Sequence, residues 1–250
     1  MSFKIISVGW NCAPFIEQTL YSVEDQERDD WEMTIVYDRS NDGGEEIIEN
    51  WHARHSNFDH YHINPDQRFA VRNQYEGIRS MAPGPDDIIV FLDLDGDRLA
   101  HPQVLERLSD FYADDTLVTY GSYQPVPDLG TCQPASPFPA HVVDENSYRA
   151  HILNGGRTSF NHLRTMKGKV FNAIPESYFK WPDGRWYNAG TDYTFMMAGL
   201  ELAGGRYKFI GETMLLYNHA NPHADNVEHP EETGACVTSS LQKTPLRPLP

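Results

Sequence analysis

Three carboxylates stand close together in residues 93–97, which read Asp-Leu-Asp-Gly-Asp. Because neighbouring carboxylates repel one another, a bound hard cation such as Mg²⁺ or Mn²⁺ is the simplest way to make the arrangement favourable. A metal held by one or two carboxylates keeps coordination positions open, and these could chelate the diphosphate of a nucleotide. A solvated acidic turn is the alternative. A calcium loop of the EF-hand type would need Gly at its sixth place and Glu at its twelfth, where this chain has Arg98 and Val104.

The apolar run of residues 87–92 comes directly before this cluster and predicts a strand that is buried on both faces. Ligands of open α/β sheets bind beyond the carboxyl ends of the strands, so the cluster stands where chemistry is expected. Other apolar patterns predict strands at about residues 4–8, 33–37, 117–120, 207–210 and 214–217, and helices at about residues 14–25, 45–51, 68–81, 102–112, 161–173 and 192–203. The opening order of strand, helix, strand, loop and helix begins a parallel sheet, so we expect an α/β fold with a mostly parallel central sheet flanked by helices.

The length and composition of the chain are those of one globular domain. A chain of 250 residues lies within the range in which an α/β protein folds as a single domain. The 40% apolar and 12% aromatic content excludes a disordered chain. The net charge of −16 argues against a surface that grips nucleic acid backbones through clustered Lys and Arg.

Neither a membrane span nor a cysteine framework is predicted. No stretch approaches the roughly 18 apolar residues that cross a bilayer, and the first residues run into a strand pattern without the layout of a signal peptide, so we expect a cytoplasmic protein. Cys12, Cys132 and Cys236 are too widely spaced for a disulfide framework or a paired-cysteine zinc site. From about Pro230 the apolar periodicity ends, so we expect residues 231–250 to form a poorly ordered tail.

Four motifs occur in this chain in an order and spacing that characterise one family. Residues 21–26 contain Ser-Val-x-x-Gln, residues 36–43 read Val-Tyr-Asp-Arg-Ser-Asn-Asp-Gly, residues 70–73 read Ala-Val-Arg-Asn, and residues 91–106 run from Phe-Leu-Asp-Leu-Asp to a Pro and a Leu-Glu. Over about residues 4–110 the chain thus resembles the family 2 glycosyltransferases of the GT-A fold. The resemblance implies a single Rossmann-like sandwich domain over residues 1–230, with a nucleotide-sugar-binding half at about 1–120 and an acceptor half at about 121–230.

The resemblance also implies a metal site and a donor site. The cofactor would be Mn²⁺ or Mg²⁺, with Asp93 and Asp95 as ligands and a histidine as a third. His223 is favoured over His219, and a surface histidine in a polar loop is the alternative for both. The donor-binding residues implied by the resemblance are Trp10, Asn11, Asp38, Ser40, Arg72, Asp93, Leu94 and Arg164.

Three residues of this donor site have further interpretations. Asp38 could accept a hydrogen bond from the N–H of a uracil, or it could serve only to form its own turn. Arg72 could pair with the donor, or it could form a surface ion pair. Tyr37 stands where the family usually has Asp, which leaves the nucleobase open, although an aromatic ring could stack on a base.

Asp192 is the candidate catalytic base. Tyr193, Met196, Met197 and Leu200 would form the apolar face of a helix that starts near Asp192, so an N-cap explains this residue in structural terms. The family's acidic motif at the start of the same helix implies instead that Asp192 deprotonates the acceptor hydroxyl in an inverting displacement. The implied function is a metal-dependent inverting glycosyltransferase that moves a sugar from a nucleotide-diphosphate donor, a UDP-sugar by resemblance, to an acceptor hydroxyl.

The acceptor and two rival functions remain open at this level. A saccharide is the expected acceptor, and a modified nucleic acid base is the alternative that the acidic charge disfavours; the oligomeric state is not predicted. A nucleotidyltransferase would carry a Gly-rich phosphate loop after the first strand, where residues 9–14 read Gly-Trp-Asn-Cys-Ala-Pro. A nucleotide-sugar-binding module without turnover is the non-enzymatic rival, and the joint presence of Asp93, Asp95 and Asp192 argues against it.

Overall fold

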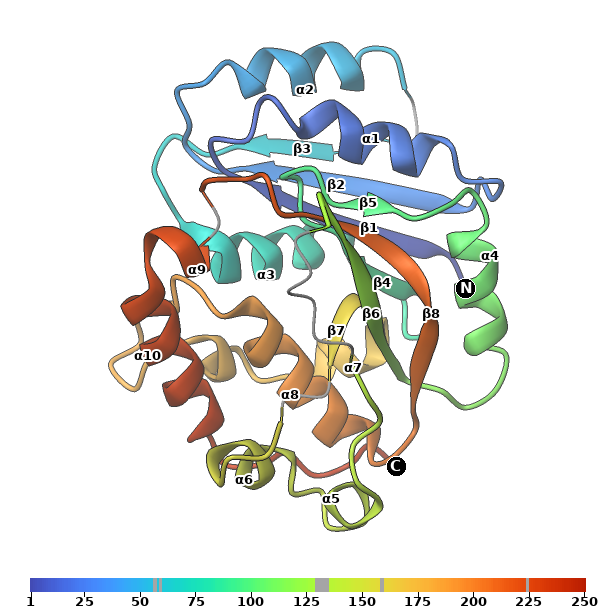
Figure 1. The fold of residues 1–250 in the computed structure, drawn as a ribbon, viewed down its shortest axis with the longest axis vertical. Coiled ribbons are helices and arrows are strands. Elements are labelled where there is room, and N and C mark those ends of the chain that lie inside the picture. Colours follow the sequence, from blue (N-terminus) through green and yellow to red (C-terminus); the bar gives the residue numbers. More distant parts are fainter. Residues whose placement is uncertain (56–57, 59, 129–134, 158–159, 224) are drawn as a thin grey trace.

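A single sheet organises the computed structural model, which describes all of residues 1–250 except 56–57, 59, 129–134, 158–159 and 224 (Figure 1). The strands follow the order β3-β2-β1-β4-β7-β6-β8-β5 across the sheet. Their bounds are β1 (Phe3–Gly9), β2 (Trp31–Tyr37), β3 (His60–Ile63), β4 (Ile88–Phe91), β5 (Arg98–Leu99), β6 (Val118–Val126), β7 (Asn161–Lys167) and β8 (Tyr207–Asn218). Strands β3, β2, β1 and β4 are parallel, as are β6 and β8, whereas β7 runs antiparallel to both of its neighbours. The predicted α/β class with a mostly parallel sheet is confirmed.

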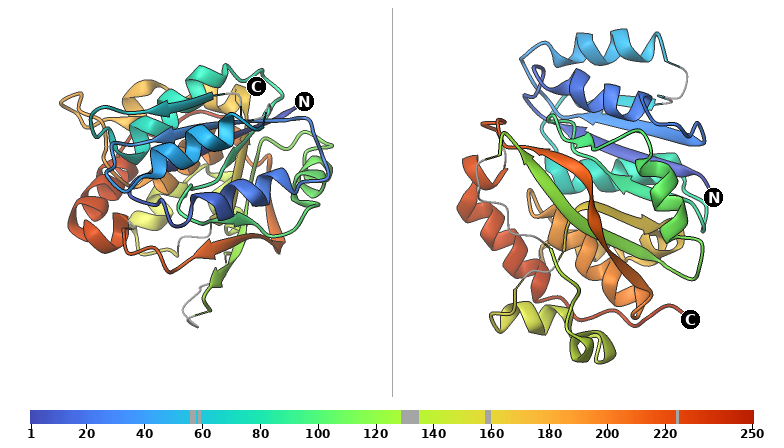
Figure 2. Two further views of the ribbon diagram at one scale, coloured as in Figure 1. Left: turned by 90° about the horizontal axis from the view of Figure 1, so that it is seen from above. Right: turned by 45° about the vertical axis from the view of Figure 1, so that its right-hand side comes forward.

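Helices cover both faces of this sheet (Figures 1 and 2). Helices α1 and α2 lie on one side of β1 and β2, and α3 and α8 lie on the other. The helices are α1 (Ile16–Glu24), α2 (Gly44–His52), α3 (Phe69–Met81), α4 (Val104–Phe111), α5 (Ala140–Asp144), α6 (Tyr148–Leu153), α7 (Gly168–Ala173), the 3₁₀ helix η1 (Glu176–Phe179), α8 (Thr191–Ala203), α9 (Asp225–Glu228) and α10 (Pro230–Leu241).

The apolar strands feed two separate cores. Phe3 and Ile5 of β1 pack into the core that contains the buried residues of α1 and α2, whereas Ile6 packs into the core that contains those of α3 and α8. Successive strand residues point to opposite faces of a sheet, so a strand that is covered on both sides must be apolar throughout. This is why every residue of β4 is buried, and why the strand before the carboxylates is the most apolar run of the chain.

The motif at residues 21–26 positions the segment that follows the carboxylates. Gln26 is buried, and its side-chain amide donates to the carbonyl of His101 at 3.0 Å. Its carbonyl oxygen accepts from the backbone N–H of Leu105 at 3.1 Å, which satisfies a free donor in the first turn of α4. The end of α1 is therefore tied to the start of α4, and the carboxylate loop between β4 and α4 is held from below.

The predicted helix over residues 161–173 is wrong in its first half. These residues form strand β7 and then the short helix α7. Leu163, Met166 and Val170 have the spacing of a helix face, but the backbone of β7 pairs with β4 on one side and β6 on the other. Two ladders of tertiary hydrogen bonds override the local pattern.

The predicted disorder of residues 231–250 is also wrong. Helix α10 occupies most of this segment, and Cys236 and Leu241 are buried against the core that contains α8. Near the end of the chain, the N–H of Leu249 donates to the carbonyl of Leu202 at 2.8 Å. The segment is weakly apolar by itself and is ordered by its contacts with α8. The two strands predicted at 207–210 and 214–217 are one strand, β8, with register shifts in its pairing to β6.

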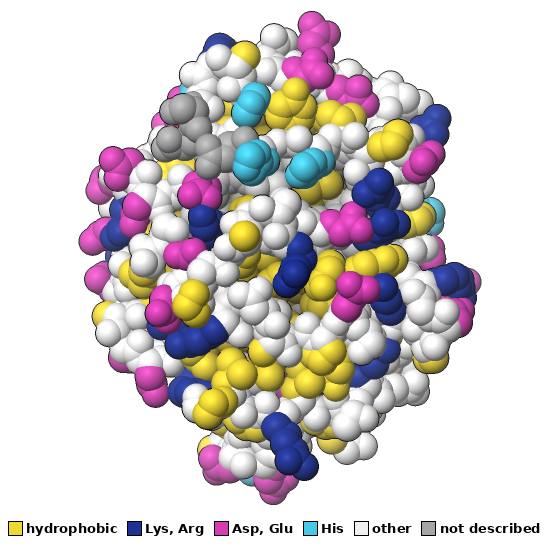
Figure 3. Space-filling model, turned by 180° about the vertical axis from the view of Figure 1, so that it is seen from behind, with side chains coloured by type: hydrophobic (Ala, Val, Ile, Leu, Met, Phe, Trp, Pro, Cys, Tyr) yellow, Lys and Arg dark blue, Asp and Glu magenta, His cyan; other side chains and the backbone are white. Residues whose placement is uncertain are grey.

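The surface opposite to the view of Figure 1 mixes acidic, basic and hydrophobic side chains (Figure 3). Histidines gather near the end that carries α2 and β3, where His60 and His62 are exposed on the edge strand. In the described part of the chain, no helix is long and apolar enough to cross a bilayer. Cys132 lies outside the described residues.

Candidate active site

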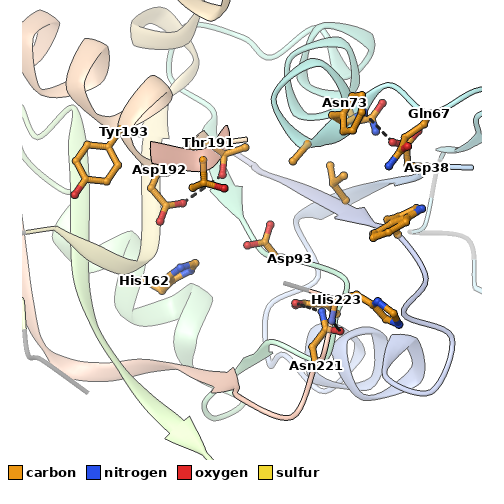
Figure 4. Close-up of a pocket in the computed structure, with 18 of the residues that line it drawn as sticks. Asp38, Gln67, Asn73, Asp93, His162, Thr191, Asp192, Tyr193, Asn221 and His223 are labelled. Atoms are coloured by element: carbon orange, nitrogen blue, oxygen red, sulfur yellow. Dashed lines mark hydrogen bonds between the residues drawn. The ribbon is translucent and has the colours of Figure 1, made fainter. Parts of the chain in front are cut away.

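A pocket of about 360 Å³ opens beyond the carboxyl ends of β1, β2 and β4, where ligands of α/β sheets bind (Figure 4). The start of α8 and the segment after β8 close its other sides. Its lining includes the predicted site residues Trp10, Asp38, Asp93, Asp95, Asp192 and His223. The fold thus brings both halves of the chain to one cavity.

The three carboxylates of residues 93–97 occupy different environments. Asp93 lines the pocket and accepts a hydrogen bond from Gln74 at 3.2 Å. Burial raises the pKa of Asp93, and the nearby Arg164 guanidinium opposes that rise. Asp97 is completely buried, and burial together with the charges of Asp95 and Asp93 holds its pKa well above the usual range.

Asp97 carries an unsatisfied oxygen. Its Oδ1 accepts from the backbone N–H of Asn218 at 2.9 Å, but within the described ranges its Oδ2 has no hydrogen-bond partner. Gly96, with φ +99°, makes the turn that directs Asp97 inward, and a Cβ at Gly96 would meet the side-chain amide of Asn218. A buried carboxylate oxygen without a donor is costly unless a cation occupies the space beside it.

His162 completes a set of metal-ligating groups that the sequence analysis did not predict. One ligand atom each of Asp93, Asp97 and His162 lies within 4.8 Å of the others. Burial and then the charge of Arg164 hold the pKa of His162 well below its usual range, so the imidazole is neutral, which is the form that binds metals. Arg164 lies 3.3 Å from Nδ1 of His162, and since a guanidinium only donates, Nδ1 carries a lone pair. Two carboxylates, one without a partner, and a neutral imidazole fit a divalent cation such as Mn²⁺.

The ligands predicted from the resemblance are placed differently from this set. Asp95 lines the pocket and accepts from the side-chain amide of Asn221 at 2.8 Å. His223 also lines the pocket, with its ring edge-on to Trp10 and its Nδ1 2.5 Å from a carboxylate oxygen of Glu228. His219 is not among the lining residues, and its ring packs against Tyr123 and Tyr217 instead. A metal role for Asp95 and His223 stays a prediction, while the geometry groups Asp93 with Asp97 and His162.

The carboxylate of Asp38 caps helix α3. Its Oδ1 accepts from the side-chain amide of Asn64 at 3.0 Å, and both of its oxygens accept from the N–H of Arg68. Its Oδ2 also accepts from the N–H of Phe69 at 2.8 Å. Phe69 has φ +64°, a conformation that costs a bulky residue about 1–3 kcal/mol and that these bonds help to hold. Asp38 therefore shapes the pocket wall, and a direct contact with a nucleobase stays a prediction.

The other residues of the predicted donor loop hold two loops together. Ser40 accepts from the N–H of Asn11 at 2.9 Å and donates to the carbonyl of Asp38. Tyr37 is buried and donates to Asp42 at 2.7 Å, so its ring cannot stack on a base. Leu94 is completely buried in the core on the α1 side, whereas Trp10 is only partly buried and lines the pocket.

Arg164 links the two acidic sides of the site. It is only 2% exposed, forms an ion pair with Asp192, and lies 3.6 Å from a carboxylate oxygen of Asp93. Asp192 stands in the first turn of α8 with 43% of its side chain exposed, and Figure 4 shows it facing the same space as His162 and Asp93. Arg72 is not part of this arrangement, because it pairs with Glu76 and lines a neighbouring pocket.

A period-2 signal could have found His162. His162 and Arg164 are two residues apart on a strand and so point to the same face. The helical interpretation of residues 161–173 placed them on different faces. Asp97 was seen in the carboxylate run, but its direction depends on the turn at Gly96 and on Asn218, which is 121 residues away in sequence.

Comparison with known proteins identifies relatives of this arrangement. The family model described as Glycosyl transferase family 2 matches residues 5–175. No curated protein sequence matches the chain.

Solved structures share the fold at low sequence identity. Residues 1–349 of S. aureus TarS in complex with UDP-GlcNAc are 14% identical, with a TM-score of 0.68, 94% of this chain covered and 64% of that chain. The mannosyltransferase PcManGT from Pyrobaculum calidifontis, in complex with GDP-Man and Mn²⁺, is 18% identical, with a TM-score of 0.58 and coverages of 88% and 57%. Glucosyl-3-phosphoglycerate synthase from Mycobacterium tuberculosis, with Mn²⁺, UDP and phosphoglyceric acid, is 10% identical, with a TM-score of 0.60 and coverages of 96% and 78%. The chain spans less than two thirds of the TarS chains that it matches.

Proposed function

The chain belongs to glycosyl transferase family 2 and is a glycosyltransferase of the GT-A fold, and from this premise we propose that it is a metal-dependent, inverting enzyme that uses a UDP-sugar. The acceptor group is a hydroxyl, and a saccharide is the acceptor that we favour. Residues up to about 120 supply most of the donor side of the pocket, and residues 121–230 supply the base and the acceptor side.

One observation carries the proposal: a metal-ligating set and a candidate base face the same pocket at the carboxyl ends of the strands. Asp93, Asp97 and His162 would hold the cation, whose positive charge stabilises the leaving diphosphate when it is bound. The structures similar to this chain support such a site, because PcManGT is in complex with GDP-Man and Mn²⁺ and the synthase from M. tuberculosis is in complex with Mn²⁺ and UDP. A UDP-sugar is the proposed donor because TarS is in complex with UDP-GlcNAc.

Asp192 is the proposed general base. Its carboxylate takes the proton of the acceptor hydroxyl, the hydroxyl oxygen forms a bond to the anomeric carbon, and the bond from that carbon to the diphosphate oxygen breaks. Attack from the side opposite to the diphosphate inverts the anomeric configuration. Arg164 orients the Asp192 carboxylate from a buried position and so reduces the freedom of the base before reaction.

The test begins with binding. In a thermal-shift assay, UDP with Mn²⁺ is expected to raise the melting temperature more than UDP alone, because the cation and the diphosphate bind the folded state together. A panel of UDP- and GDP-sugars then identifies the donor through release of the free nucleotide. Equal stabilisation by UDP with and without Mn²⁺ would contradict metal dependence.

Asp192→Asn separates an enzyme from a binding module. General base catalysis contributes about 10²–10⁴-fold, so nucleotide release should fall by that factor while binding of UDP with Mn²⁺ is retained. Asp110→Asn is a matched control, since this carboxylate is 64% exposed on α4. An undiminished rate in Asp192→Asn would refute the assignment of the base, and no turnover in the wild type with any donor would favour a module that only binds.

A further inference from the structure

A second pocket, of about 370 Å³, adjoins the candidate active site. The two share Gln67 and Phe69 as a common wall, and Figure 4 shows Gln67 beside Asp38 at the edge of the first pocket. Its lining combines aromatic, cationic and amide side chains: Gln67, Arg68, Phe69, Arg72, Trp181, Arg185, Trp186, Asn188 and Glu232. None of these residues has a role in the transfer step proposed above.

Two tryptophans form a rigid apolar surface in this pocket. Trp181 and Trp186 are each partly buried, so part of each ring remains accessible. The Trp181 ring packs edge-on against Tyr187 at 5.0 Å, and the Trp186 ring packs against Tyr75 at 5.2 Å. Rings held in this way lose little entropy when a ligand binds, and the C–H faces of a pyranose ring are the polar ligand surface that packs on an indole.

The charges that line the pocket are mainly positive. Three guanidinium groups face one lining carboxylate, that of Glu232, which already accepts from the Asn188 amide at 2.5 Å. Arg68 and Arg72 both bond to Glu76, at 3.0 and 2.7 Å, so a single carboxylate serves two cations. Each guanidinium has five N–H donors and these bonds use one on each, so both can still donate to a ligand. Such an arrangement is unexpected in a chain with a net charge of −16.

The position of this pocket relates it to the base. Trp186 and Asn188 lie in the segment that leads directly into Gly190 and Asp192 at the start of α8. A molecule on the tryptophans would therefore extend along this segment and past the shared wall of Gln67 and Phe69 toward the transfer site.

We propose that the second pocket is the acceptor subsite and that it binds a saccharide carrying an anionic group, with the sugar on Trp181 and Trp186 and the anion at Arg68 and Arg72. Carboxylate and phosphate both match the planar, bidentate donor geometry of arginine, so the shared chemistry is an anion on a sugar. This inference rests on the proposed function, since it supplies the acceptor for the hydroxyl that Asp192 deprotonates.

Calorimetric titration of the full chain, saturated with UDP and Mn²⁺, tests the inference. The probes are tetragalacturonate, which carries carboxylates, glucose 6-phosphate, which carries a phosphate, and cellotetraose, which is neutral. We expect at least one acidic probe to bind about tenfold more tightly than cellotetraose, and Trp186→Ala and Arg72→Gln to weaken that binding about tenfold or more. Tyr21→Ala and Arg107→Gln change an exposed aromatic ring and an exposed arginine on α1 and α4, and they should leave the affinity within about twofold.

The outcomes separate the two proposals. If neither acidic probe binds better than cellotetraose, or if Trp186→Ala binds the acidic probe as the wild type does, the anionic acceptor subsite is refuted. The preceding titration with UDP and Mn²⁺ is independent of this pocket and reports on the fold of each variant. Failure of the wild type in that titration would refute the proposed donor site instead.

Discussion

Replacing Asp38 by asparagine should destabilise the whole domain. The side chain keeps its size, but one acceptor oxygen becomes an amide that can only donate. The wild-type carboxylate accepts from the N–H of Arg68 and of Phe69 and from the side chain of Asn64, at 2.8–3.0 Å and with only 2% of the residue exposed. An asparagine can satisfy one side of this arrangement, so a donor on the other side is left facing an N–H group.

The size of the effect follows from these contacts. An unsatisfied buried donor costs about 1–3 kcal/mol, and the surviving bonds lose the added strength that a charged acceptor gives. The sum is about 3 kcal/mol of unfolding free energy, which for a domain of this size lowers the melting temperature by about 6–12 °C.

Urea unfolding and differential scanning calorimetry measure this change. Asp66→Asn is the control, because that carboxylate is 86% exposed and only 3.8 Å from Arg39, and it should change stability by less than about 0.5 kcal/mol. If Asp38→Asn unfolds within about 0.5 kcal/mol of the wild type, the capping argument fails. A loss of UDP affinity at unchanged stability would then support a direct contact between Asp38 and the nucleobase.

Three further changes test other parts of the structure. Glu201→Gln should cost about 3–5 kcal/mol in urea unfolding, because it leaves Arg149 buried without its charged partner; retention of wild-type stability would contradict the burial of this pair. Gly44→Ala should cost about 1–3 kcal/mol, since the added methyl group would meet the hydroxyl of the buried Tyr37, and a stabilised variant would show that the ring can move. Asp97→Asn should weaken Mn²⁺ binding about tenfold or more in titrations followed by calorimetry, whereas an unchanged affinity would remove Asp97 from the metal site.

Local patterns predicted the elements whose hydrophobic period is clear. The strand before the carboxylates, the helices near α1, α2, α3 and α8, and the position of Asp93 at a strand end all follow from short stretches of sequence. Residues 161–173 and 231–250 were wrong because neighbours decide their structure. Strand β7 exists through its pairing with β4 and β6, and α10 is ordered by packing on α8.

The site divides in the same way. The sequence by itself determined the family, the sheet, the carboxylate run and the acidic start of α8, because these depend on residue types within single segments. Only the tertiary structure decided that His162 joins Asp93 and Asp97, that Arg164 pairs with Asp192, that Asp38 caps a helix and that Arg72 faces a second pocket. Each of these depends on hydrogen bonds and charges between segments far apart in the chain, and the direction of a side chain toward such partners is set by packing, which no local pattern contains.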